Sequence, residues 1–188
     1  MFHEIGSNKN GRSVNVTDTN RLKTEAVSSS AISEISKESG EAFIFSSDFI
    51  SLTTTGSFNG IVYLKNNSTK DLYINSIRTC ADGTGAVQVK VIEDPTTGTL
   101  ISDANSGNVR SMSLGSNVTF EGSFYSASAD GKTVTDGTDL TQFINKMAGH
   151  SIQEYNGGLI LKKSKAFAIT AKPSASTDFC LEIQGWLE

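Results

Sequence analysis

The stretch GGLILKKSKAFAITAKPSASTDFCLEIQGWLE (Gly157–Glu188) carries the pattern that decides the fold. Near its end, Phe179, Leu181 and Ile183 stand at every second position, which is typical of a strand with one buried and one polar face. Earlier, Ala166–Ile169 is apolar without interruption, which predicts a strand covered on both faces by a second sheet, an arm or a neighbouring subunit. The stretch therefore predicts neighbouring β-strands joined by polar turns.

The same pattern extends back to about residue 41. Turn sequences such as NNSTKD (Asn66–Asp71) and ADGTG (Ala81–Gly85) separate short apolar runs, as in sandwiches and barrels. A chain of 188 residues suits one β domain preceded by an arm. We predict an all-β protein, with a jelly-roll-like antiparallel β-sandwich over residues 41–188, an extended N-terminal arm and one short helix. The expected strands are Ala42–Phe45, Phe49–Leu52, Gly60–Lys65, Leu72–Thr79, Ala86–Glu93, Leu100–Ser102, Val118–Tyr125, Ser151–Glu154, Gly158–Lys162, Ala166–Lys172 and Phe179–Trp186.

Residues 1–40 differ from the rest because they are polar and have only isolated apolar positions. Such a segment buries too little apolar surface to fold alone, so it is either a disordered leader or an arm that pairs with another sheet. We favour the arm, with subunit-interface positions at Val14, Val16, Leu22 and Val27. Residues Ser28–Ser39 fit a short helix that Ser30 caps and Gly40 ends.

One later segment, TDLTQFINKMAGH (Thr138–His150), has helical rather than alternating spacing. Leu140, Phe143, Ile144 and Met147 stand at positions i, i+3, i+4 and i+7, which predicts a short amphipathic helix. We expect Thr138 or Asp139 at its N-cap and Gly149 just past its end. Its expected role is to close one end of the sandwich.

Residues that could carry chemistry are few. The only histidines are His3, in the polar arm, and His150, where we expect it to meet the helix dipole. The only cysteines, Cys80 and Cys180, lack metal-site spacing, and Cys180 should lie opposite to the buried face of its strand as a small filler under a loop or subunit. We predict no catalytic, cofactor-binding or metal residues, and no enzyme activity. Five aspartates in predicted turns are interpreted as turn formers rather than calcium ligands: Asp82, Asp94, Asp130, Asp136 and Asp139.

Charge and hydropathy limit the kinds of partner. The formal net charge is −4 and no Lys/Arg cluster is present, which argues against nucleic acid. The apolar runs are far shorter than a membrane-spanning helix. The first residues contain no apolar signal segment, so we expect the chain to stay in a cytoplasm until it assembles.

Trp186, the single tryptophan, has two interpretations. Continued alternation from Ile183 would put Trp186 on the outer face, as an anchor in a subunit interface. A β-bulge at Gly185 would turn it into the core instead. We slightly favour the bulge, and keep Trp186 as a candidate interface residue.

Two segments, GIVYLKNNSTKDLYINSI (Gly60–Ile77) and Gly157–Glu188, together with VTDTNRLKTEAVSSS (Val16–Ser30), resemble jelly-roll structural proteins of tailed bacteriophages. This resemblance implies a virion protein, such as a capsid decoration or cement subunit, a head fibre, or a neck or tail component. It implies assembly in the host cytoplasm and partners that include the major capsid protein and further copies of the chain, as a homotrimer. The alternative is a glycan- or receptor-binding module of a fibre, neck or baseplate.

Overall fold

The computed structural model describes residues 15–16, 22–23, 31–101, 108–146 and 149–188. The chain divides into two units, residues 1–31 and residues 32–188. In the first unit, β1 (Asn15–Val16) pairs antiparallel with β2 (Leu22–Lys23), and Val16 stands opposite Leu22. This pairing is local to the first unit, whereas the sequence predicted an arm that pairs with another sheet.

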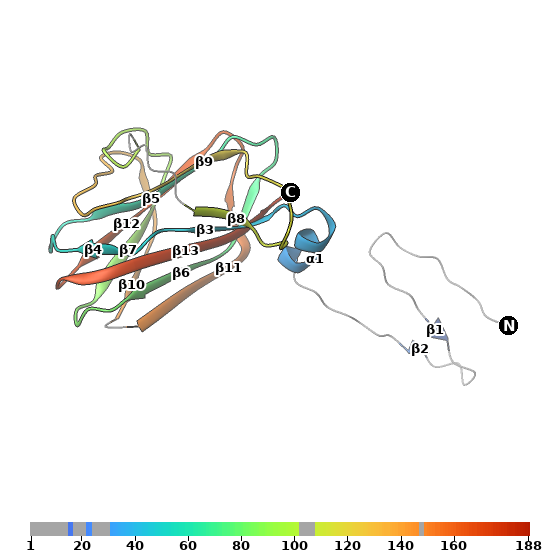
Figure 1. Ribbon diagram of the computed structural model, residues 1–188, viewed down its shortest axis with the longest axis horizontal. Helices are drawn as coiled ribbons and strands as arrows, with labels where there is room; N and C mark the ends of the chain where they lie inside the picture. Colours follow the sequence, from blue (N-terminus) through green and yellow to red (C-terminus); the bar gives the residue numbers. More distant parts are fainter. Residues whose placement is uncertain (1–14, 17–21, 24–30, 102–107, 147–148) are drawn as a thin grey trace. The chain divides into compact units, whose positions relative to one another are not determined.

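The second unit is a sandwich of two antiparallel sheets (Figure 1). The five-stranded sheet has the order β10-β7-β12-β5-β9, and the six-stranded sheet has the order β11-β6-β13-β3-β8, with β4 also paired to β13. The bounds are β3 (Ala42–Ser46), β4 (Ile50–Leu52), β5 (Asn59–Asn66), β6 (Leu72–Ala81), β7 (Val87–Glu93), β8 (Asn108–Ser111), β9 (Gly122–Ser126), β10 (Thr138–Asn145), β11 (Gly149–Leu161), β12 (Ala166–Pro173) and β13 (Thr177–Leu187).

The strand order is that of a jelly roll. Strands β3 and β4 both belong to the six-stranded sheet, and from β4 to β7 the chain alternates between the sheets. From β10 to β13 it alternates again, so that β12 lies between β5 and β7 while β13 lies between β3 and β6. These interleaved pairings are the two Greek keys of a jelly roll. Strands β8 and β9 are additions that extend one edge of each sheet. The predicted fold class is therefore confirmed.

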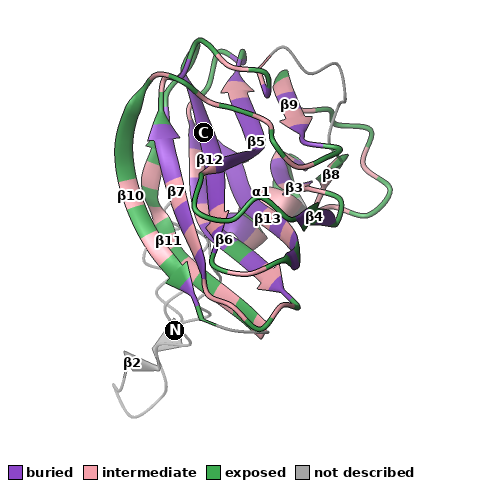
Figure 2. Ribbon diagram, turned by 90° about the vertical axis from the view of Figure 1, so that its left-hand side faces the viewer, coloured by how far each residue is buried: buried purple, intermediate pink, exposed green. Residues whose placement is uncertain are grey.

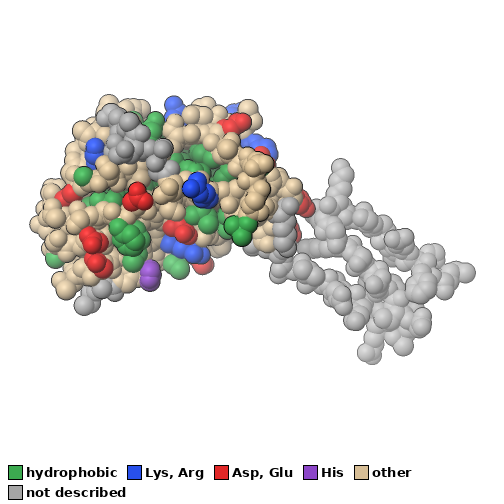
Figure 3. Space-filling model, viewed as in Figure 1, with side chains coloured by type: hydrophobic (Ala, Val, Ile, Leu, Met, Phe, Trp, Pro, Cys, Tyr) green, Lys and Arg blue, Asp and Glu red, His purple; other side chains and the backbone are tan. Residues whose placement is uncertain are grey.

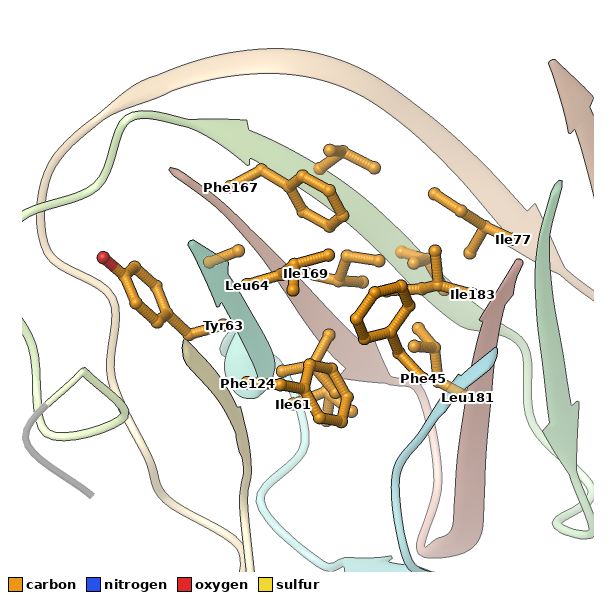
Figure 4. Close-up of a cluster of buried hydrophobic side chains, with 14 of the residues drawn as sticks. Phe45, Ile61, Tyr63, Leu64, Ile77, Phe124, Phe167, Ile169, Leu181 and Ile183 are labelled. Carbon is orange, nitrogen blue, oxygen red and sulfur yellow. The ribbon is translucent and has the colours of Figure 1, made fainter. Parts of the chain in front are cut away.

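The core lies between the sheets, and its aromatic centre is Phe45 (Figure 4). Phe45 is fully buried, and its ring lies 4.9 Å from that of Phe120 and 5.5 Å from that of Phe124. The outer face of the five-stranded sheet is also covered, by segments 94–101 and 127–137. There, the Gly60 amide donates to the Lys132 carbonyl at 2.7 Å, and the side chain of Leu100 is fully buried. Loops of the same chain therefore supply the second cover predicted for the continuous apolar strands.

The short helix expected near residue 30 is present as α1 (Ala31–Glu38). The amides of Ser39 and Gly40 both donate to the Ile35 carbonyl. Gly40 has a φ of +70°, the left-handed conformation that suits the end of a helix. Gly40 therefore ends this helix as predicted, whereas Ser30 lies outside the described residues.

The helix predicted over Thr138–His150 is wrong. Thr138–Asn145 is strand β10, and Gly149, expected beyond the helix end, begins strand β11. Phe143 stands opposite Val89 of β7 and packs on the core, whereas Leu140 and Ile144 are exposed. As a strand, the segment supplies backbone partners to one whole side of β7, which a helix cannot do. Met147 lies outside the described residues.

Other strand boundaries also differ from expectation. The two strands predicted over Ser151–Lys162 are the single strand β11, and Leu100 lies in a turn. The strand predicted from Val118 begins only at Gly122. Strand β8 was missed because it is short and polar, with Val109 as its single large apolar residue. These differences lie at sheet edges, where burial imposes the weakest pattern.

Two of the acidic turns hold loops together through carboxylates. Asp130 accepts hydrogen bonds from the amides of Thr53 (2.8 Å) and Thr54 (2.7 Å). Burial alone would raise the pKa of Asp130, but these hydrogen bonds outweigh burial and lower the pKa to about 2. The Thr96 hydroxyl and the Thr97 and Thr96 amides likewise lower the pKa of Asp136 to about 2. Both groups fit the predicted role of turn formers.

These depressed pKa values predict acid-sensitive stability. An aspartate carboxyl in an unfolded chain has an ordinary pKa of 3.8, so the stabilisation is complete above that pH and is lost as the pH falls through the folded-state value. The double variant D130N/D136N should be less stable than wild type at pH 7 and should lose less stability between pH 5 and pH 2. Urea unfolding at each pH measures this difference. An equal loss in both proteins would contradict the prediction.

Candidate functional site

Metal-binding side chains do not gather into a cluster in the described part of the chain. Across residues 31–101, 108–146 and 149–188, no three His, Cys, Asp or Glu side chains are placed to hold a metal ion. On the face seen in Figure 3, acidic and basic side chains are interspersed. His150 is exposed on β11 opposite Cys80, because the helix expected to precede it is absent. None of the helices in the described ranges is long and apolar enough to cross a membrane.

The two cysteines form a cross-strand pair that the sequence did not predict. Cys80 of β6 stands directly opposite Cys180 of β13, and both thiols are free and partly buried. As expected, Cys180 lies on the face opposite to Phe179 and Leu181. Burial, together with the neighbouring Cys80, raises the pKa of the Cys180 thiol to about 11. At neutral pH Cys180 is therefore a protonated, weakly nucleophilic thiol.

Trp186 is buried, but not in the way that the sequence favoured. The strand pairing is irregular between Gln184 and Gly185, yet the extra residue is Asn75 of β6. Trp186 therefore keeps the alternation and stands opposite Tyr73 and Ala42, outside the main core. It is only 5% exposed, because α1 covers it through Ile32. Within this chain Trp186 anchors the helix and is not an exposed residue.

The other predicted interface positions lie in the first unit. Val16 and Leu22 stand opposite each other in the β1–β2 pair, and Val14 and Val27 lie outside the described residues. Nothing in the structure tests whether these four positions contact another subunit. Their role in an interface stays a prediction.

An apolar surface that the sequence missed lies along β10 and β11, two strands with many exposed positions (Figure 2). Each strand ends the order of its sheet, so among the described residues each has one side without a partner strand. Leu140 and Ile144 on β10 are 47% and 48% exposed, and Ile152 and Ile160 on β11 are 50% and 38% exposed. We call these four residues the edge surface. The spacing of Leu140 and Ile144 fits a helix as well as a strand. Because the segment was predicted as a helix, the sequence did not indicate this surface.

A groove of about 190 Å³ adjoins the edge surface. Its walls include Leu140, Leu159, Ile160 and Phe167, with Lys162 and Lys165 at the rim. Both lysines are already paired. The Lys162 ammonium lies 2.7 Å from a carboxylate oxygen of Asp71, and Lys165 pairs with Asp94. The hydrogen bond from Lys162 lowers the pKa of the Asp71 carboxyl. The groove is thus lined mainly by apolar side chains, with the two paired lysines and Glu93 as its charged residues.

A second depression, of about 230 Å³, lies over the outer face of the five-stranded sheet. Phe58 forms one wall, with the Lys90 and Lys172 ammonium groups 4.5 Å and 5.0 Å from its ring centroid. Asp139 bonds Lys90, and the Thr170 hydroxyl is buried without a hydrogen-bond partner. The depression combines an aromatic ring with charged groups and a free hydroxyl.

Comparison with known proteins adds no relative to these observations. No protein-family model, no curated protein and no solved structure matches the chain.

Proposed function

We propose that the chain is a non-enzymatic structural subunit of a bacteriophage virion, a capsid decoration or cement protein that attaches through its N-terminal arm. The observation that carries the proposal is the combination of a jelly-roll sandwich over residues 32–188 with a separate N-terminal unit. A rigid sandwich provides the body of a decoration subunit. A separate segment with short strands provides a connection that can add to the sheet edge of a neighbour.

The state of the polar groups also supports a structural role. In the described part of the chain, Asp71, Asp94, Asp130 and Asp136 all hold loops or ion pairs. Groups engaged in this way stabilise the sandwich and are not poised for proton transfer. The resemblance of three segments to phage jelly-roll proteins points in the same direction.

The test is quantitative mass spectrometry of purified virions from a phage that encodes this chain. We expect the chain at a fixed ratio to the major capsid protein, as for a subunit bound at a repeated site of the shell. Its absence from purified particles would contradict the proposal. A ratio corresponding to only a few copies would instead assign it to the neck, the tail or a fibre.

The second candidate is a glycan- or receptor-binding module, and the depression beside Phe58 favours it. An aromatic wall and an unpaired hydroxyl such as that of Thr170 are the groups that bind sugars. Because Lys90 and Lys172 lie over the Phe58 ring, its face is not free to stack on a sugar. We therefore expect no specific signal on a glycan array. A specific signal that F58A abolishes would favour this second function.

A further inference from the structure

Within the part of the chain that the structure describes, no strand pairs with the outer side of β11 in the six-stranded sheet. Strand β11 pairs with β6 along residues 149–154 and again along residues 159–161, and it is the last strand in the order. The other side of β11 presents backbone groups that another strand can bind. Along the first segment, His150, Ile152 and Glu154 are exposed on one face of the sheet. A long free edge with an exposed isoleucine is a site for strand addition.

An irregularity limits this edge to a short segment. The register with β6 shifts between Glu154 and Leu159, where Asn156 and Gly157 have φ values of +50° and +80°. A continuous ladder requires extended backbone, so it cannot pass through these two residues. Gly149 also has a positive φ, of +148°, and its carbonyl accepts a hydrogen bond from the Asn145 side chain. The segment available for regular pairing is therefore His150–Glu154.

We propose that His150–Glu154 is a self-association site, in which β11 pairs antiparallel with β11 of a second copy about a two-fold axis at Ile152. A two-fold contact brings the same surface together from both copies. This register places Ile152 against Ile152 of the second copy. It also places His150 of each copy opposite Glu154 of the other copy. A histidine and a glutamate therefore lie opposite each other at two symmetric positions.

The order of side chains along this segment favours this register and a second copy of the chain as the partner strand. Exposed residues must pair with exposed residues, because opposite positions in an antiparallel pair share one face. Centring the pair on Ser151 would oppose Ile152 to His150, and centring it on Gln153 would oppose Ile152 to Glu154. Only the register centred on Ile152 places an apolar side chain opposite an apolar one and a polar side chain opposite a polar one. The segment is thus complementary to itself, which identifies a second copy as its partner.

This contact does not depend on the proposed virion role, since it concerns the chain with itself. It is also distinct from the arm, because every residue that it uses lies on β11. A two-fold contact does not by itself build the homotrimer expected from the sequence. The oligomeric state of the isolated protein therefore distinguishes the two-fold β11 contact, which gives a dimer, from the expected homotrimer.

The first test changes the charged side chains at positions 150 and 154. It measures association of the full chain by sedimentation equilibrium. Wild type should show a monomer–dimer equilibrium. H150E opposes two glutamates at both symmetric positions and should weaken the dimer about tenfold. The double variant H150E/E154H restores both pairs in reversed order and should recover dimerisation. Since both positions are exposed, thermal unfolding of the monomer, measured at concentrations too low for association, should be unchanged in all variants.

The second test traps the register. Directly opposite residues in an antiparallel pair have Cα atoms roughly 4.5–5.5 Å apart, within the range that a disulfide spans. I152C should therefore give a covalent dimer on copper-catalysed air oxidation, with a peptide mass that shows the introduced cysteine linked to its own counterpart in the second copy. The matched control is I144C on β10, which is 48% exposed against 50% for Ile152. It should remain monomeric on a non-reducing gel.

Several results would overturn the proposal. These are a monomer at all concentrations up to the millimolar range, a dimer or trimer that H150E does not weaken, and failure of the double exchange to restore association. Equal cross-linking of I152C and I144C would also overturn it. None of these results bears on whether the chain is present in virions.

Discussion

Replacing Trp186 with alanine is expected to lower the free energy of unfolding by about 3–5 kcal/mol, the usual cost of removing a buried aromatic side chain. The Trp186 ring stacks on Tyr73, with centroids 5.6 Å apart and planes 11° from parallel. The same ring fills the space beside Gly157, where an added Cβ would lie 2.7 Å from it. Its loss removes the anchor of α1 as well as the stacking contact. Urea unfolding followed by circular dichroism measures the effect, since the variant has no tryptophan to report by fluorescence.

The matched variant W186F should recover a large part of this loss, because a phenylalanine ring can still stack on Tyr73. In W186A we also expect α1 to detach, so its amides should exchange faster with solvent while those of β13 remain protected. A change below about 1 kcal/mol in W186A would contradict the prediction. It would mean that the helix and Trp186 contribute little to holding the fold.

Deleting Met1–Val27 is expected to abolish binding to the virion while leaving the sandwich folded. The deletion ends before α1, so the contact between Ile32 and Trp186 is retained. Residues 32–188 form a unit of their own, which predicts a shift in Tm of less than about 2 °C. Co-sedimentation with particles that lack the protein measures binding. Differential scanning calorimetry measures the Tm.

Two outcomes would contradict the arm hypothesis. If the truncated protein fails to fold, residues 1–27 belong to the core. If it binds particles as well as the full chain does, the attachment surface lies on the sandwich, and the edge surface is the next candidate. The single substitutions V16D and L22D provide a finer test, because they change the arm without shortening it. Both should weaken binding without changing the Tm.

Sequence patterns predicted much of the sandwich where burial is strongly one-sided or complete. The alternation of Phe179, Leu181 and Ile183 placed these residues correctly on the inner face of β13. The continuous apolar run in β12 correctly indicated a strand covered on both faces. Such patterns are reliable because each buried position must be apolar whatever its partner is.

The segment Thr138–Asn145 was wrongly predicted because the spacing of its apolar residues fits both a helix and a strand. Leu140, Phe143 and Ile144 form one face of a helix, yet in β10 Phe143 points to the core while the other two are exposed. The segment is a strand because its backbone pairs with β7 (Val87–Glu93), which lies about fifty positions away in the chain. The spacing of residues within one segment carries no information about a distant partner strand, so tertiary contacts can override the local pattern.

What the sequence by itself determined is the fold class, the positions of most strands and the end of α1 at Gly40. Tertiary structure alone decided the pairing of Cys80 with Cys180, the burial of Trp186 beneath α1 and the exposed apolar edge of β10 and β11. The physical reason is that each residue's hydrophobicity sets how far it should be buried. Which residues bury it depends on hydrogen bonds and packing between strands far apart in the chain.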